Sequence, residues 1–166
     1  MSGLALFMML SFGIGLAASA GVEVVESKCG PKPELPPADA PLEEKIQRDR
    51  EMLEWIRCRI SELGGRVPCS AVSDADALLD DILAEFVIVV PPIPRLDPPS
   101  KDADDLLDQM VACAAVAEEI YGSGGSPSLV DRFVAWQHLD WIDRHLPLLT
   151  HQLGCHDLDP AKPGRQ

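Results

Sequence analysis

The stretch that decides the fold is residues 126–154, SPSLVDRFVAWQHLDWIDRHLPLLTHQLG. Its large apolar side chains recur every three or four residues over about seven turns, the spacing that lines one face of an α-helix. These side chains are Leu129, Phe133, Trp136, Leu139, Ile142, Leu146, Leu149 and Leu153. Ser126 and Pro127 predict the start of this helix, and Gly154 predicts its end. Pro147 removes one backbone hydrogen bond, so we expect a kink or two abutting helices there.

Three further segments show the same spacing. The first predicted helix covers residues 41–63. The second is expected to be capped by Ser73 and to run through Phe86, and the third is expected to be capped by Ser100 and to end at the glycines from Gly122. The β-branched run after Phe86 would also suit a short strand. Four amphipathic helices hide their apolar faces most simply against one another, so the sequence predicts an all-α, four-helix bundle.

The N-terminal twenty residues predict where the protein is located. An uncharged apolar run from Leu4 to Leu16 leads to Ala18-Ser19-Ala20, which is a cleavage site of the secretory type. We therefore expect a signal peptide over residues 1–20 and a secreted, extracellular protein. A retained signal anchor is the alternative, although the apolar run is shorter than the roughly 20 residues that span a bilayer.

The rest of the chain divides by composition. We expect a proline-rich extended arm over residues 21–40, the bundle over 41–154 and a loose tail over 155–166. The chain carries 27 acidic against 14 basic residues, which argues against a nucleic-acid partner and against an anionic membrane surface. After signal cleavage we expect a monomer that stays off the membrane.

Five cysteines remain after such cleavage. In an oxidising compartment they predict two disulfides and one leftover thiol, and the sequence leaves every pairing open. Cys29 is a candidate to tie the arm to the bundle. Since the chain contains no Cys-x-x-Cys, a structural role is favoured over a redox role. The five are Cys29, Cys58, Cys69, Cys113 and Cys155.

The sequence offers little for catalysis or for a metal. His138 and His145 share a helix face but lie about 10 Å apart along its axis, too far to share one ion directly. The acidic clusters at residues 74–81 and 102–105 lack the glycine and terminal glutamate of a calcium loop. They are more simply helix-start charges and solvated faces. We expect no enzyme, no cofactor and no metal site.

One pattern points to a protein partner. On the first helix, Arg48, Met52, Trp55 and Arg59 form a second stripe beside the core stripe, and Trp141 and Arg144 repeat the theme on the last helix. Arginine and tryptophan often carry protein–protein binding energy, so these six residues are the predicted receptor-binding set. The alternative is that the two tryptophans pack at the edges of the core.

Several segments resemble the long-chain helical cytokines, and within them interleukin-6 with its gammaherpesvirus-encoded homologues. The first two segments are similar to the arm and first helix of the viral forms, the third to the second helix, and the last two to the fourth helix. The segments are residues 35–48 (LPPADAPLEEKIQR), 52–56 (MLEWI), 83–87 (LAEFV), 128–135 (SLVDRFVA) and 144–146 (RHL).

The resemblance implies an up-up-down-down bundle whose first, third and fourth helices engage receptors. It also implies that Cys58 and Cys69 form the family's first small disulfide loop. The predicted function is that of a secreted cytokine-like ligand that binds and bridges class I helical-cytokine receptor chains. The connection after the first helix is only about ten residues, and that before the fourth is shorter, which favours antiparallel neighbours instead.

Two alternatives remain. Cys29, Cys58, Cys113 and Cys155 are spaced somewhat like the cysteines of type I interferons, in which the first pairs with the third and the second with the fourth. Outside the cytokines, a secreted or periplasmic, disulfide-stabilised helical binding or inhibitor module would share the same composition and periodicity.

Overall fold

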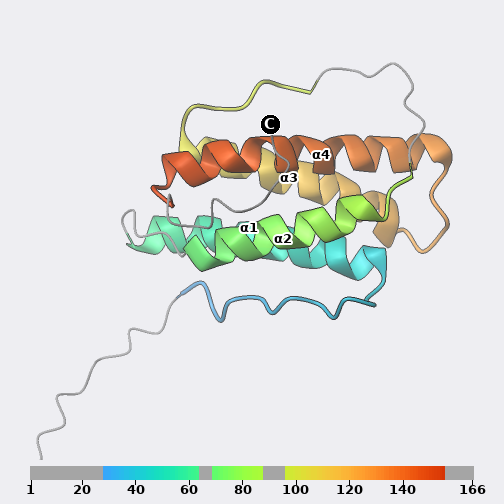
Figure 1. Ribbon diagram of the computed structural model, residues 1–166, viewed down its shortest axis with the longest axis horizontal. Helices are drawn as coiled ribbons and strands as arrows, with labels where there is room; N and C mark the ends of the chain where they lie inside the picture. Colours follow the sequence, from blue (N-terminus) through green and yellow to red (C-terminus); the bar gives the residue numbers. More distant parts are fainter. Residues whose placement is uncertain (1–27, 64–68, 88–95, 156–166) are drawn as a thin grey trace, which may run out of the picture.

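The computed structural model describes residues 28–63, 69–87 and 96–155. These residues form four α-helices and no strand: α1 (Leu42–Leu63), α2 (Cys69–Ala84), α3 (Ala103–Gly122) and α4 (Leu129–Gln152) (Figure 1). The all-helical prediction is confirmed. The expected signal peptide, residues 21–27 of the arm, most of the run after Phe86 and the tail from residue 156 lie outside the described residues.

The first turn of α2 lies before the predicted start. The helix begins at Cys69, and Ser73 lies within it instead of capping it. Ala71, Val72 and Ala75 are buried there against the core. Small apolar residues carry a weak periodic signal, which is why the sequence pattern begins too late.

Two other helix starts are displaced by two residues from those predicted. Asp102, not Ser100, caps α3, and its side chain accepts from the backbone N–H groups of Asp104 and Asp105. Ser128, not Ser126, caps α4 in a reciprocal capping box with Asp131. In both cases the acidic residues after the cap fix the helix start, because they satisfy or complement its free N–H groups.

The helix α4 continues through Pro147, so two abutting helices are not formed. Pro147 is exposed, and water can hydrate the carbonyl group that its ring leaves without a donor.

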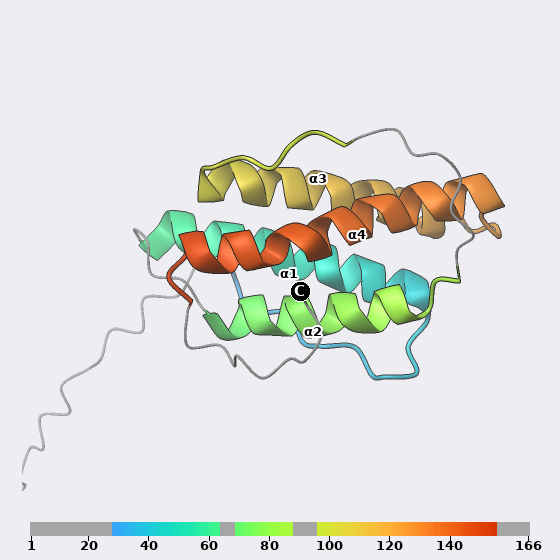
Figure 2. The same ribbon diagram turned by 45° about the horizontal axis from the view of Figure 1, so that its top comes forward.

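Neighbouring helices of the bundle are antiparallel. The contacting pairs are α1 with α2, α2 with α4, α4 with α3, and α3 with α1 (Figure 2). Near the start of α1, Lys45 pairs with Glu85 just beyond the end of α2, and the side chain of Gln152 at the end of α4 donates to the backbone oxygen of Lys101 before α3. The Cys69–Cys155 disulfide joins the start of α2 to the end of α4, so these two helices are antiparallel as well. The order along the chain is therefore up, down, down, up.

The up-up-down-down order implied by the cytokine resemblance is wrong for this structure. Residues 64–68 and 123–128 are too short to return along a whole helix, so each joins two near ends. The long connection is the crossover, residues 85–102, because α2 ends and α3 begins at opposite ends of the bundle (Figure 1).

One core fills the space between the helices. Every helix contributes fully buried aliphatic side chains to it, with leucine, isoleucine and methionine the largest. Burying apolar area of this kind is the main favourable term in folding. The largest members are Ile46, Met52, Leu53, Ile56, Leu79, Ile82, Leu106, Leu107, Met110, Leu139, Ile142 and Leu146.

Two disulfides staple the bundle, as the cysteine count predicts. Cys29 of the arm is bonded to Cys58 of α1, and Cys69 at the start of α2 is bonded to Cys155 just after α4. Cys113 is the free thiol. The predicted link between the arm and the bundle is confirmed.

The pairings suggested by the family resemblances are wrong here. Cys58 is not bonded to Cys69, because Cys58 faces the arm while Cys69 meets the end of α4. The interferon-like pairing fails as well, since Cys113 is free. Cys155 was expected to begin a loose tail, yet it is buried and held by its disulfide.

Candidate functional site

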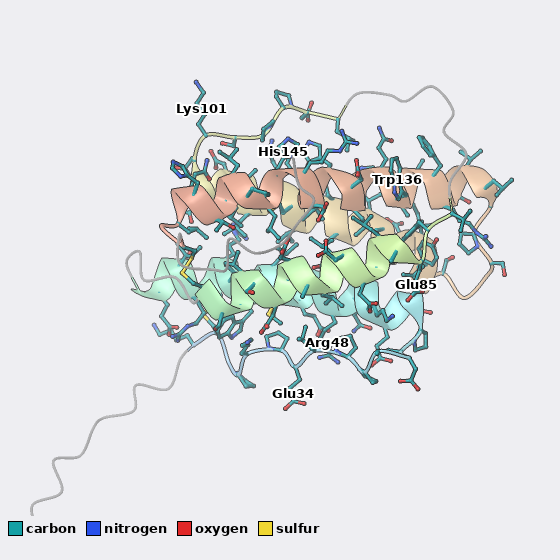
Figure 3. All side chains as sticks on the ribbon, viewed as in Figure 1. Glu34, Arg48, Glu85, Lys101, Trp136 and His145 are labelled. Atoms are coloured by element: carbon teal, nitrogen blue, oxygen red, sulfur yellow. A yellow bond between two sulfur atoms is a disulfide. The ribbon has the colours of Figure 1, made fainter. Side chains whose placement is uncertain are left out.

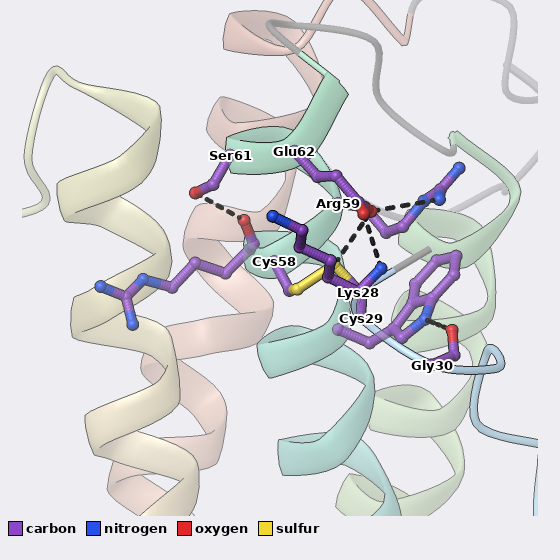
Figure 4. Close-up of a disulfide and its surroundings, with 9 residues drawn as sticks. Lys28, Cys29, Gly30, Cys58, Arg59, Ser61 and Glu62 are labelled. Carbon is purple, nitrogen blue, oxygen red and sulfur yellow. Dashed lines mark hydrogen bonds and ion pairs between the residues drawn. A yellow bond between two sulfur atoms is a disulfide. The ribbon is translucent and has the colours of Figure 1, made fainter. Parts of the chain in front are cut away.

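Trp55 of the predicted receptor stripe holds the arm. Its indole Nε1 donates a hydrogen bond of 3.1 Å to the backbone oxygen of Gly30 (Figure 4). The guanidinium of Arg59 lies 5.5 Å from the centre of the Trp55 ring, within range of a cation–π contact. The indole and the guanidinium therefore already have partners within the chain.

Further contacts fix the same arm segment. The Cys29–Cys58 disulfide lies beside Glu62, which accepts a hydrogen bond of 2.6 Å from the backbone N–H of Lys28 (Figure 4). The other Glu62 oxygen pairs with Arg59 at 3.5 Å. This end of α1 is thus a docking site for the chain's own arm.

The other two members of the stripe do not form a free surface with Trp55. Met52 has no exposed area, so its prediction as a surface contact is wrong. The reason is that α2, α3 and the arm all pack around α1, so more than one face of this helix is buried. Arg48 is partly exposed and pairs with Glu51 at 3.1 Å, while its Nε is buried without a hydrogen-bond partner.

Trp141 has a comparable role on α4. It is only 8% exposed, and its Nε1 donates a hydrogen bond of 3.0 Å to the backbone oxygen of Asp97 in the crossover. Its ring lies 4.4 Å from the ring of His145, centre to centre. Trp141 is therefore an anchor for the crossover and not an exposed anchor for a partner.

A groove follows the outer side of α4 beside the crossover. It encloses about 380 Å³, and its lining includes Pro98, Trp136, Arg144 and His145. Trp136 and His145 are partly exposed and lie along α4 (Figure 3). The Arg144 side chain is 69% exposed and pairs with Asp140 at 2.7 Å. Of the six predicted contacts, Arg144 is the one that remains largely open to a partner.

The sequence missed Trp136 and His145 as groove residues. Trp136 was assigned to the core seam of its helix, and no local pattern places the crossover next to it. The seam spacing is correct for one buried face, but the groove depends on where residues 96–99 lie in space.

The free cysteine lies in a neighbouring hollow of about 210 Å³, on the other side of Leu96 and Asp97. Burial, and secondarily the charge of Asp97, raise the pKa of the Cys113 thiol to about 11. At neutral pH the thiol is protonated, and the thiolate is the nucleophilic form. Cys113 is thus poorly suited to act as a nucleophile.

His138 and His145 of α4 make local contacts. Nδ1 of His138 lies 2.8 Å from the backbone oxygen of Val134, and Nδ1 of His145 lies 2.7 Å from that of Trp141. Because a carbonyl oxygen only accepts, each Nδ1 is the donor in its contact. Each contact spans four residues and stays within α4.

Three aspartates from two helices form a group that could hold a metal ion. Asp76 and Asp80 of α2 and Asp143 of α4 each place a carboxylate oxygen within 4.8 Å of the others. The acidic residues of 74–81 were expected to be helix-start charges and solvated faces, but α2 begins at Cys69, so none of them lies in its first turn. Asp143 is far away in the sequence, so only the fold brings the three together.

Comparisons of the chain with protein-family models, with curated proteins and with solved structures find no match. The cytokine resemblance is therefore carried by the five quoted segments alone. None of the helices in the described part of the chain has both the length and the apolar character needed to cross a membrane.

Proposed function

We propose that the protein is a secreted helical ligand that acts by binding a partner protein, without covalent chemistry, through the groove between α4 and the crossover. The observation that carries the proposal is the lining of this groove, where Trp136, Arg144 and His145 are accessible together. Aromatic and arginine side chains beside a groove are the groups that most often supply protein–protein binding energy.

The two disulfides support a function outside the reducing cytosol. Two disulfides tie the arm and the end of α4 to the bundle, and such bonds persist in oxidising compartments. The leader-like residues 1–20 predict the same destination.

The partner that we propose is the ectodomain of a class I helical-cytokine receptor chain. The resemblance assigns receptor contact to the fourth helix, and the groove lies along this helix. Bridging two receptor chains would require a second face. Arg48, partly exposed beside the arm, is the remaining candidate for that face on α1.

A second candidate function is favoured by the order of the helices. The up-down-down-up arrangement differs from the order that the cytokine resemblance implies, and a disulfide-stabilised binding or inhibitor module unrelated to cytokines has no such requirement. This module would use the same groove on a different partner.

Binding to the receptor chain that transduces interleukin-6 signals tests the proposal. Purified protein from Gly21 onward, with both disulfides formed, is passed over the immobilised ectodomain. We expect saturable binding that Trp136→Ala or Arg144→Ala weakens at least about tenfold.

The matched control is Arg57→Ala, which removes an exposed arginine from α1, where it pairs with Asp108 of α3. We expect this variant to bind like the unchanged protein. No binding by a folded, helical sample would reject the receptor proposal and leave the unrelated binding module as the better candidate.

A further inference from the structure

One position in the core face of α1 holds an acidic side chain. Ile46, Asp49, Leu53 and Ile56 follow one another at intervals of three, four and three residues, so they lie on one face of the helix. None of the four has any exposed area. An aspartate therefore occupies a place that the helix otherwise fills with aliphatic side chains.

The carboxyl group of Asp49 has no partner at this position. Neither of its oxygens has a hydrogen-bond partner among the residues that the structure describes. Burial first, and the charge of Asp143 second, hold the pKa of Asp49 well above its ordinary value. Because an ionised carboxylate without water or a partner is costly, a buried one tends to keep its proton.

The basic residues nearest to Asp49 along α1 do not neutralise it, because each of them pairs with other acidic groups. Lys45 is itself buried, and its two ion pairs direct its ammonium group toward the end of α2. The pairs are Lys45 with Asp81 and Glu85, Arg48 with Glu51, and Arg50 with Glu54 and Glu118.

The other helices offer no positive charge to Asp49 within the described core. The residues that α3 buries are all apolar, and the buried polar residue of α4, Gln137, is uncharged. Asp143 of α4 lies with Asp76 and Asp80 of α2, and the carboxylate oxygens of these three lie within 4.8 Å of one another. Negative charge on these helices opposes the ionisation of Asp49.

We infer that Asp49 is a pH-sensitive device in the bundle: the folded protein keeps Asp49 protonated, and it loses stability as the pH rises from acidic toward neutral. The unfolded chain releases the proton of an aspartic acid at about pH 4. Above that pH the folded state binds one proton more than the unfolded state, so this contribution to stability falls until the folded protein releases the proton too.

Urea unfolding of the whole secreted chain, with both disulfides formed, tests this inference. The unfolding equilibrium constant of the unchanged protein is compared with that of Asp49→Asn, which has nearly the same shape and cannot ionise. We expect the ratio of the two constants to rise at least about tenfold between about pH 4.5 and about pH 7.5. One retained proton changes the constant by up to about tenfold per pH unit.

Asp39→Asn is the matched control, since this aspartate of the arm is exposed. The corresponding ratio for this variant should stay within about twofold over the same range. A second measurement needs no variant. In an NMR titration of the carboxyl carbons of the unchanged protein, the signal of Asp49 should change well above about pH 4, the ordinary value of an aspartic acid.

Two results would overturn the inference. One is a ratio for Asp49→Asn that is as independent of pH as the ratio for Asp39→Asn. The other is an Asp49 carboxyl signal that changes near pH 4, and this titration decides alone if Asp49→Asn does not fold. Since neither measurement contains a receptor, both results leave the proposed function untouched.

Discussion

Trp55 and Trp141 each donate an indole N–H to a backbone oxygen in a segment outside the helices. A buried indole loses its hydration, so it needs such a partner. The same residue type that suggests a binding surface can therefore be satisfied within the chain. For these two tryptophans, the alternative that they pack at the core edge describes the structure better.

Trp141→Ala should lower the free energy of unfolding by about 3–5 kcal/mol, because it leaves a cavity and frees the crossover. Trp136→Ala, at a partly exposed site of the same helix, should lower it by about 1 kcal/mol or less. Urea unfolding followed by circular dichroism measures both. A Trp141→Ala protein that is as stable as the unchanged protein but no longer binds the receptor would show that Trp141 is a receptor contact.

Cys113 should react slowly with alkylating reagents while the protein is folded. With its pKa raised to about 11, the thiol is deprotonated only as the pH rises toward that value. At pH 8 its thiolate fraction, and hence its reaction rate with iodoacetamide, should be roughly 100-fold below that of an exposed cysteine. Equal rates for the folded protein and for a cysteine peptide at pH 8 would contradict this prediction.

At the residue scale, the sequence points to side chains that could bind a partner, but it does not predict reliably whether each of them is exposed. The exposure of Arg144 was predicted, while Met52 was assigned to a surface stripe and is itself fully buried. Periodicity locates the face of a helix, but it does not say how many neighbours cover that helix. The arm over Trp55 and the crossover over Trp141 supply the missing cover.

At the scale of the elements, the helix ends depend on particular caps. Ser128→Ala should cost about 1 kcal/mol, because the N–H of Asp131 loses its acceptor. Ser126→Ala is the control at the position that the sequence favoured, and it should change stability by less than about 0.5 kcal/mol. Chemical denaturation compares the two variants. A larger loss in Ser126→Ala would place the start of α4 earlier than the structure does.

The existence of the helices was predictable, and their starts were less so. The apolar spacing at three and four residues is strong in α1 and α4, where large side chains define the face. It is weak in the first turn of α2, where Ala71 and Val72 are buried and Cys69 is held by its disulfide. Helix starts also depend on which of several polar residues caps, and neighbouring serines compete for this role.

At the scale of the whole molecule, the two disulfides differ in reach. Cys69–Cys155 spans 86 residues of sequence, and Cys29–Cys58 spans 29. Chain entropy alone predicts a loss of about 4.5 kcal/mol on replacing the first pair with serine and about 3.5 kcal/mol for the second. Urea unfolding of the two double variants measures the losses. If removing Cys29–Cys58 lowers the free energy of unfolding more than removing Cys69–Cys155, then attachment of the arm stabilises the protein more than the bond between the start of α2 and the end of α4.

The sequence was enough to predict a four-helix bundle, but no single sequence feature decided the up and down order of its helices. The short connections 64–68 and 123–128 favour antiparallel neighbours, whereas the family resemblance implied a parallel first pair. The fold follows the connections, because a short loop cannot span a helix. The disulfide pairs, the α4 groove and the aspartate cluster each join distant segments, so their grouping could not be predicted from the sequence, although the cysteines and Arg144 were recognised there.

The account depends on one arrangement, in which the arm covers α1, the start of α2 meets the end of α4, and the groove on α4 is left for a partner. Disulfide mapping by mass spectrometry of an unreduced digest tests it most directly. We expect Cys29 linked to Cys58, Cys69 linked to Cys155, and Cys113 free. A bond between Cys58 and Cys69 would contradict the arrangement, because it would release both the arm and the end of α4.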